Sequence, residues 1–188
     1  MIQFPRAQGA NGPSTAMTVL DEILTRLRER PEPPLLVPPG TWDPALSERI
    51  ERLAAPPELR AALFLWNDHL ERAHELAQDI PTSTGSYLHG VMHRREPDYG
   101  NAKYWFRRVG DHPAFGPLHA AARELLEGPF RQVAEAAPLR RKNAWDPFLM
   151  VDWCAAAEGR DPSDPFGRFL REIQLREIEG LARFAAAP

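Results

Sequence analysis

The sequence is short of the residues that several classes of protein require. It holds one cysteine, Cys154, among 188 residues, which excludes an intramolecular disulfide and any metal site built from several cysteines. No apolar run approaches the roughly 20 residues that a membrane-spanning helix needs. Neither a glycine-rich phosphate loop nor a GxSxG nucleophile elbow is present. We therefore expect no membrane partner and no nucleotide site of the common loop type.

β-branched residues are also scarce. Val, Ile and Thr together supply 18 residues, whereas Ala and Leu supply 47, and Ala and Leu favour helices over sheets. This composition predicts an all-α fold and argues against an all-β one. Because the length suits one domain, we expect a single irregular helical domain of six to eight helices over residues 17–188.

The chain has no strong excess of charge of one sign. Its formal net charge is -3 and its pI is about 6.1, so the surface as a whole attracts neither nucleic acid nor anionic lipid. Residues 1–16 lack the basic start and apolar core of a signal peptide. We expect them to form a disordered N-terminal arm, and we expect a cytoplasmic protein.

Prolines and helix caps divide the rest of the chain. Eight of the twenty prolines fall between Pro31 and Pro57, which predicts a Pro-rich surface connection interrupted by a short helix that Asp43 caps. The apolar period predicts one continuous central helix from Glu58 to about Asp79. Further helices are expected at about 18–30, 86–95, 99–109 after the cap Asp98, 118–126, 130–136, after Asp146, and 166–184.

Clustered histidines are the main chemical signal. All six lie between positions 69 and 119. His89 and His93 are four residues apart, so a helix projects both imidazoles from one face, where they can share a divalent cation. His74 on the preceding helix is the first candidate for a third ligand. We predict a catalytic set of His74, His89, His93 and Glu71, and a divalent-metal set of His74, His89, His93 and Asp98.

The structural alternative stays open at this point. An HxxxH pair arises on helices without any metal, and buried histidines often serve only as hydrogen-bonding core residues. The segment from His74 to Gln78 departs from the HExxH zinc motif, because Gln78 stands where the second imidazole belongs. Gly90, between His89 and His93, indicates either close helix packing or room for a ligand against the backbone.

Basic residues gather directly after these histidines. Five of them stand against only two acidic residues, Glu96 and Asp98, and guanidinium groups bind phosphate and carboxylate in a bidentate way. The pattern predicts a small anionic ligand, although solvated or ion-paired helix faces have the same appearance. The predicted anion-binding residues are Arg94, Arg95, Lys103, Arg107 and Arg108.

The same region carries a resemblance to known sequences. Residues 86–113 contain His89-Gly90, the run from His93 to Asp98, and the run from Asn101 to Arg108 in that order. This segment resembles the hallmark stretch of a family of uncharacterised bacterial and fungal proteins, and the resemblance covers roughly residues 60–115. It implies one helical domain and brings no established activity. The stretch DYGNAKYWFRRVG is also similar to the second half of a Sel1-like helical repeat.

Two functions from different classes follow. The first is a small-molecule site in residues 67–112, where a histidine acts as general base on a phosphate- or carboxylate-bearing substrate, with a divalent metal as the candidate cofactor. The second is a helical interaction module that docks a partner protein through the aromatic and arginine face of residues 99–108. Nucleic acid is not an expected partner of either.

Overall fold

The computed structural model describes residues 15–161 and 163–187, which form α-helices, one short 3-10 helix and no strand. Residues 1–14 of the expected N-terminal arm lie outside the described residues. The elements are α1 (Thr15–Arg28), α2 (Pro44–Glu51), α3 (Pro57–Trp66), α4 (Leu70–Ala77), α5 (Ser83–Arg95), α6 (Tyr99–Val109), α7 (Phe115–Glu127), η1 (Ala134–Ala136), α8 (Ala137–Arg141), α9 (Pro147–Ala156) and α10 (Pro165–Ala185).

The all-α prediction is confirmed, but the expected number of helices is not. The described residues form ten α-helices rather than six to eight. The caps Asp43, Asp98 and Asp146 each accept hydrogen bonds from the first turn of their helix, as the sequence predicts. Within the described part of the chain, no helix is both long and apolar enough to cross a membrane.

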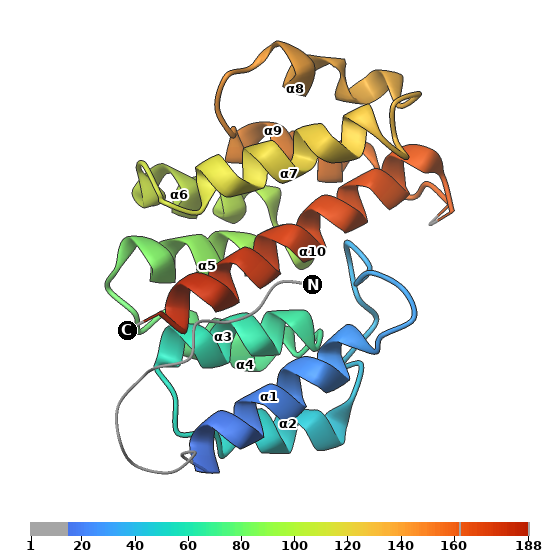
Figure 1. Cartoon of the computed structure of the whole chain (residues 1–188). Coiled ribbons are helices and arrows are strands. Elements are labelled where there is room, and N and C mark those ends of the chain that lie inside the picture. Colours follow the sequence, from blue (N-terminus) through green and yellow to red (C-terminus); the bar gives the residue numbers. More distant parts are fainter. Residues whose placement is uncertain (1–14, 162, 188) are drawn as a thin grey trace.

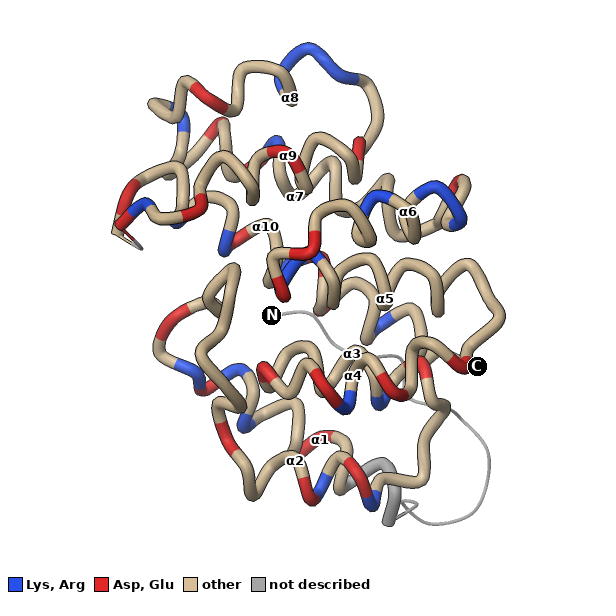
Figure 2. The backbone as a smooth tube through the Cα atoms, turned by 180° about the vertical axis from the view of Figure 1, so that it is seen from behind, with Lys and Arg blue, Asp and Glu red and all other residues tan. Residues whose placement is uncertain are grey.

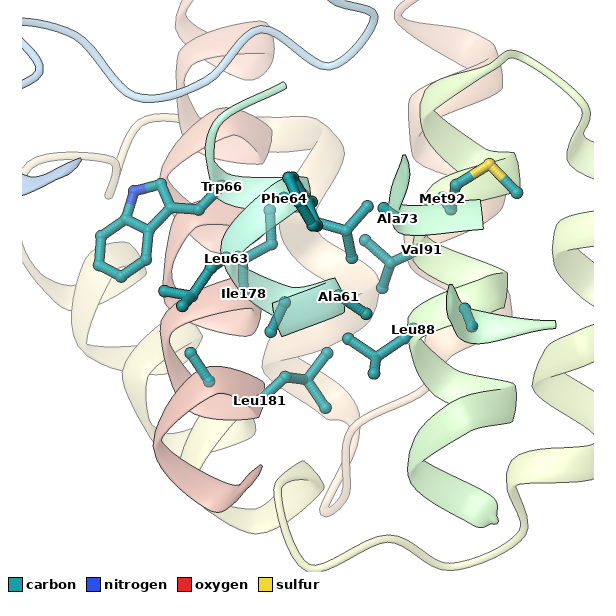
Figure 3. Close-up of a cluster of buried hydrophobic side chains, with 14 of the residues drawn as sticks. Ala61, Leu63, Phe64, Trp66, Ala73, Leu88, Val91, Met92, Ile178 and Leu181 are labelled. Carbon is teal, nitrogen blue, oxygen red and sulfur yellow. The ribbon is translucent and has the colours of Figure 1, made fainter. Parts of the chain in front are cut away.

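The helices are arranged around α10, which crosses the molecule between α1–α4 and α7–α9 (Figure 1). The C-terminal half of α10 belongs to a buried apolar cluster built mainly from α1 to α6. Its N-terminal half belongs to a second cluster, to which α7, α8 and α9 contribute. Figure 3 shows the first cluster, in which Leu88 and Val91 of α5 and Ile178 and Leu181 of α10 lie on two sides of α3.

Helix α5 is the most enclosed of the central helices, although its composition is polar. Every residue from Thr84 to Arg95 is buried, including two histidines and two arginines. The expected central helix was instead Glu58 to Asp79. Periodicity could not identify α5, because a helix that is buried on all sides has no polar face against which an apolar stripe stands out.

Two buried ion pairs hold the end of α5. Arg94 pairs with Glu177 of α10, and both side chains are fully buried. Glu177 also accepts a 3.0 Å hydrogen bond from the hydroxyl of Tyr87, one more α5 side chain. Arg95 pairs with Asp68 in the turn between α3 and α4. Because an unpaired buried charge is strongly destabilising, these pairs determine how α5 is placed against α10 and α4.

The predicted continuous helix over residues 58–79 is wrong, because the chain breaks after α3. Asp68 has φ +60°, and the N–H groups of Asp68 and His69 bond back to Leu65 O and Phe64 O at 3.2 and 2.9 Å. This is the Schellman arrangement, which usually has glycine at the left-handed position. Asp68 stands there because its carboxylate bridges Arg95 and Arg30, with the latter at 2.6 Å.

The Pro-rich connection is partly built into the interior. Pro34 is buried, and the carbonyl of Leu35 accepts hydrogen bonds of 3.0 Å from both Arg95 and Gln174. Arg171 donates to the carbonyl of Pro33 at 3.2 Å. The expected surface connection therefore also supplies acceptors for buried donors. No α-helix spans the expected range 130–136; the short 3-10 helix η1 occupies its last three residues, and α8 begins directly after it.

We predict that Asp68→Asn lowers the free energy of unfolding by about 3–5 kcal/mol, because it leaves the buried Arg95 and the half-buried Arg30 without their carboxylate. Asp68→Gly removes the left-handed strain, yet it should also be destabilising, since the lost charge outweighs the backbone relief of roughly 1–2 kcal/mol. Urea unfolding followed by circular dichroism measures both.

The matched control is Glu48→Gln. Glu48 also pairs with an arginine, Arg52, at 3.2 Å, but both side chains are exposed. This substitution should change the free energy of unfolding by less than about 0.5 kcal/mol. If Asp68→Gly were as stable as the wild type, backbone strain rather than charge pairing would govern the turn.

Candidate metal centre

Three histidines from two neighbouring helices meet at one point. His74 comes from the middle of α4, whereas His89 and His93 lie one turn apart on α5. One nitrogen from each ring lies within 4.8 Å of the others. The ring centroids of His74 are 4.8 Å from His89 and 5.3 Å from His93, and the rings of His89 and His93 are stacked. The structure therefore brings together the three predicted imidazoles.

Helix α6 closes the cluster from the side of His89. The Trp105 indole stacks on the His89 ring at 4.0 Å between centroids, with the planes 17° apart. Gly90 allows this approach, since a Cβ there would lie 3.2 Å from the ring of Phe106. Of the two explanations for this glycine, the structure supports helix packing, and the residue that occupies the space is Phe106.

His89 is a buried ring without any hydrogen-bond partner. His89 is 3 % exposed, and neither Nδ1 nor Nε2 of its ring has a hydrogen-bond partner within the described residues. At least one nitrogen of a neutral imidazole carries a hydrogen, and the other is a strong acceptor or metal ligand. Leaving both unpaired in the interior costs free energy. The ring is therefore one that a bound ligand would satisfy.

Electrostatics keep these rings in the form that binds metals. Burial, together with the neighbouring His93 and His74, lowers the pKa of His89 to about 4. Burial and His74 also lower the pKa of His93, against the opposing effect of Asp98 and Glu96. Both rings are thus neutral at neutral pH, which is the state that coordinates a cation.

Two carboxylates lie near the buried Nδ1 of His93. Its Nδ1 is 3.7 Å from Glu96 Oε2 and 3.9 Å from Asp98 Oδ2, distances longer than a hydrogen bond. Asp98 also caps α6 by accepting from the backbone of Asn101 at 3.2 Å. The expected metal ligand Asp98 is therefore placed behind His93, on the Nδ1 side, while the three-histidine group forms without it.

The remaining predicted catalytic residue, Glu71, lies apart from the cluster. It is exposed in the first turn of α4, where its charge acts on His69. Asn67, at the start of the predicted site region, follows the last residue of α3 and donates 2.8 Å hydrogen bonds to Asp43 O and Ser47 Oγ. The break after α3 rotates the two halves of the expected helix relative to each other.

The five basic residues predicted to bind an anion do not lie together in the structure. Arg94 and Arg95 follow His93 by about 100° and 200° around the helix, and both are buried in the ion pairs described above. Lys103 pairs with Asp152 of α9. Arg107 and Arg108 are exposed on α6, a helix that lies at one edge of the molecule and carries Lys and Arg residues (Figure 2). These residues are close in the sequence, but the helices direct their side chains to different sides.

Sequence reasoning missed two members of the site, Trp105 and Glu96. Trp105 was assigned to the aromatic face of an interaction module, and Glu96 was counted only as a charge. The spacing of Glu96, three residues after His93 and directly after the last residue of α5, was a signal that could have identified it. Nothing local predicts the stacking of Trp105, because it depends on how α6 packs against α5.

The comparisons with known proteins add no relative. No protein-family model, no curated protein and no solved structure matches the chain. The resemblance of residues 60–115 to a family thus stays a prediction from sequence, and the site has to be judged on its geometry.

We predict that His89 takes up a proton only near pH 4 in the metal-free protein. An unfolded imidazole takes it up near pH 6.5, so lowering the pH from 6.5 toward 4 should favour unfolding. NMR titration of the histidine Cε1 protons, with stability measured at each pH, checks this. A His89 midpoint near pH 6.5 would contradict the buried, neutral ring.

Proposed function

We propose that the protein binds one divalent transition-metal ion of the zinc class through His74, His89 and His93. The observation that carries the proposal is the convergence of three imidazole nitrogens within 4.8 Å of one another. Nitrogens bound to one tetrahedral zinc ion lie roughly 3.3 Å apart, given Zn–N bonds of about 2.0–2.1 Å. Small rotations about the side-chain torsions close that difference.

The surroundings of the three rings support a metal over a purely structural role. A core histidine is normally hydrogen-bonded. His112 shows this, since it lies 3.2 Å from Thr84 Oγ1 and accepts from Ala114 N at 3.1 Å. His89 has no such partners. His74 is only half-buried, whereas His89 and His93 are buried.

Each residue has a distinct role in this proposal. His93 turns Nδ1 toward Glu96 and Asp98, which leaves its Nε2 for the metal, as in the carboxylate–histidine–metal arrangement. Trp105 fixes the plane of His89 by stacking. Three nitrogen ligands leave a fourth position for water or a small anion, where the metal supplies Lewis acidity for hydrolysis. The expected anionic ligand then binds at the metal rather than at the arginines.

The second candidate function remains an interaction module on α6. Tyr104 is 48 % exposed, and Arg108 lies over its ring at 5.9 Å, which resembles the aromatic and arginine anchors of interfaces. Trp105, the other expected anchor, is half-buried, and its ring stacks on His89 while Arg108 lies over it at 5.4 Å. Because Trp105 is partly covered by the histidine cluster, the metal centre is the better supported function.

We predict that the untagged wild-type protein binds one Zn²⁺ or Co²⁺ per chain. Metal affinity should fall by at least about 100-fold in each of the variants His74→Gln, His89→Gln and His93→Gln. This loss exceeds the one expected when a residue that only orients a ligand is replaced. Isothermal titration calorimetry measures the affinity, and metal analysis of protein purified without a histidine tag measures occupancy.

His119→Gln is the control for these variants, because it removes a histidine of α7 that is not in the cluster. It should bind the metal as the wild type does. A bound metal should also raise the apparent stability, by about 2.7 kcal/mol at a free concentration 100 times Kd. If the three variants bound as tightly as His119→Gln, the proposed centre would be refuted.

We further predict that Asp98→Asn and Glu96→Gln weaken metal affinity by about 10–100-fold without abolishing binding, since they orient a ligand rather than serve as one. Asp152→Asn, which neutralises a comparable carboxylate paired with Lys103, should have no effect on affinity. A total loss of binding in Asp98→Asn would instead make Asp98 a direct ligand.

A further inference from the structure

A serine and a histidine outside the metal cluster form a second chemically competent pair. Ser47 Oγ of α2 lies 2.9 Å from Nδ1 of His69, the residue that precedes α4. Ser47 is 7 % exposed, whereas His69 is half-buried. The two helices meet here because Asn67, next to the α3–α4 turn, bonds to both Asp43 and Ser47.

The hydrogen bonds around Asn67 determine which way the serine proton points. Asp43 N donates to Asn67 Oδ1 at 3.2 Å, which identifies the other terminal atom of Asn67 as the nitrogen. That nitrogen donates to Asp43 O and to Ser47 Oγ, each at 2.8 Å. Since Ser47 Oγ accepts from Asn67, its own hydrogen is free to point at His69 Nδ1.

This direction is the one that a nucleophile and its general base require. His69 then accepts at Nδ1 and carries its hydrogen on Nε2. Burial lowers the pKa of His69 below its ordinary value. Arg72 also lowers this pKa, whereas Glu71 and Glu51 raise it. The ring is therefore neutral and able to take a proton at neutral pH.

A cavity opens in front of the pair. Its volume is about 410 Å³, and Ser47, His69, Phe64, Pro44 and Arg72 are among the residues that line it. Phe64 and Pro44 provide apolar walls. Helix α4 begins directly after His69 without a side-chain cap, so its first amide groups have no side-chain acceptor and carry partial positive charge beside His69. The Arg72 guanidinium, which also lines the cavity, is paired with Glu51 and Glu75.

We propose that Ser47 is a nucleophile activated by His69, and that the site accepts small carboxylic esters. Ser47 Oγ forms a bond to the ester carbonyl carbon while its proton moves to His69 Nδ1. The bond to the leaving alcohol then breaks, and that alcohol departs with the proton from His69. A water molecule repeats the sequence on the acyl-serine, so the net reaction consumes one ester and one water and releases one acid and one alcohol.

The test is covalent labelling of the full chain with an alkyl fluorophosphonate, which forms a P–O bond to an activated serine and releases fluoride. We expect one adduct per chain on Ser47, located by peptide mass spectrometry. Ser47→Ala should abolish it, and His69→Gln should slow it by about 100-fold or more, as the loss of a general base does. The wild type should also hydrolyse 4-nitrophenyl acetate at Ser47.

Two controls keep the test specific. Ser163→Ala removes an exposed serine whose backbone N–H and hydroxyl donate to Asp161, and it should leave labelling unchanged. A chelator should also leave labelling unchanged, because this site does not depend on the proposed metal centre. Mapping on the folded wild type decides the question even if a variant unfolds. An unmodified Ser47, or equal labelling rates in the wild type and His69→Gln, would overturn the proposal.

Discussion

The arrangement of this fold depends on two guanidinium groups that are buried at the C-terminal end of α5. An arginine does not lose its charge at ordinary pH, so Arg94 and Arg95 each need a carboxylate in the interior. Glu177 comes from α10, and Asp68 comes from the turn between α3 and α4. The two pairs therefore join segments that are far apart in the sequence and hold α5 in one rotational position. His89 and His93, earlier on the same helix, take their directions from it.

Helix α4 connects the two candidate sites to that constraint. The Asp68 turn directs the start of α4, so that His69 contacts Ser47 of α2 while His74 contacts the α5 histidines. The geometry of this one turn therefore affects the positions of both histidines.

Features controlled by near neighbours were predictable from the sequence. The caps Asp43, Asp98 and Asp146 act on amides two or three residues away, and the amphipathic α10 follows from a sustained apolar period. The HxxxH pair likewise lies on one face of α5, because four residues make about one helical turn. The errors occur where distant contacts override local preference, above all the break at Asp68 and the inward direction of Arg94 and Arg95.

The sequence by itself determined the helical class, the positions of the capped helix starts, and the shared face of His89 and His93. Only the tertiary structure decided that His74 joins them, that Trp105 covers them, and that Ser47 meets His69. The physical reason is range. Helix propensity, capping and periodicity act within a few residues. The pairing of buried charges and the packing of helices instead depend on residues that are far apart in the chain, so the partner of each residue is known only from the folded structure.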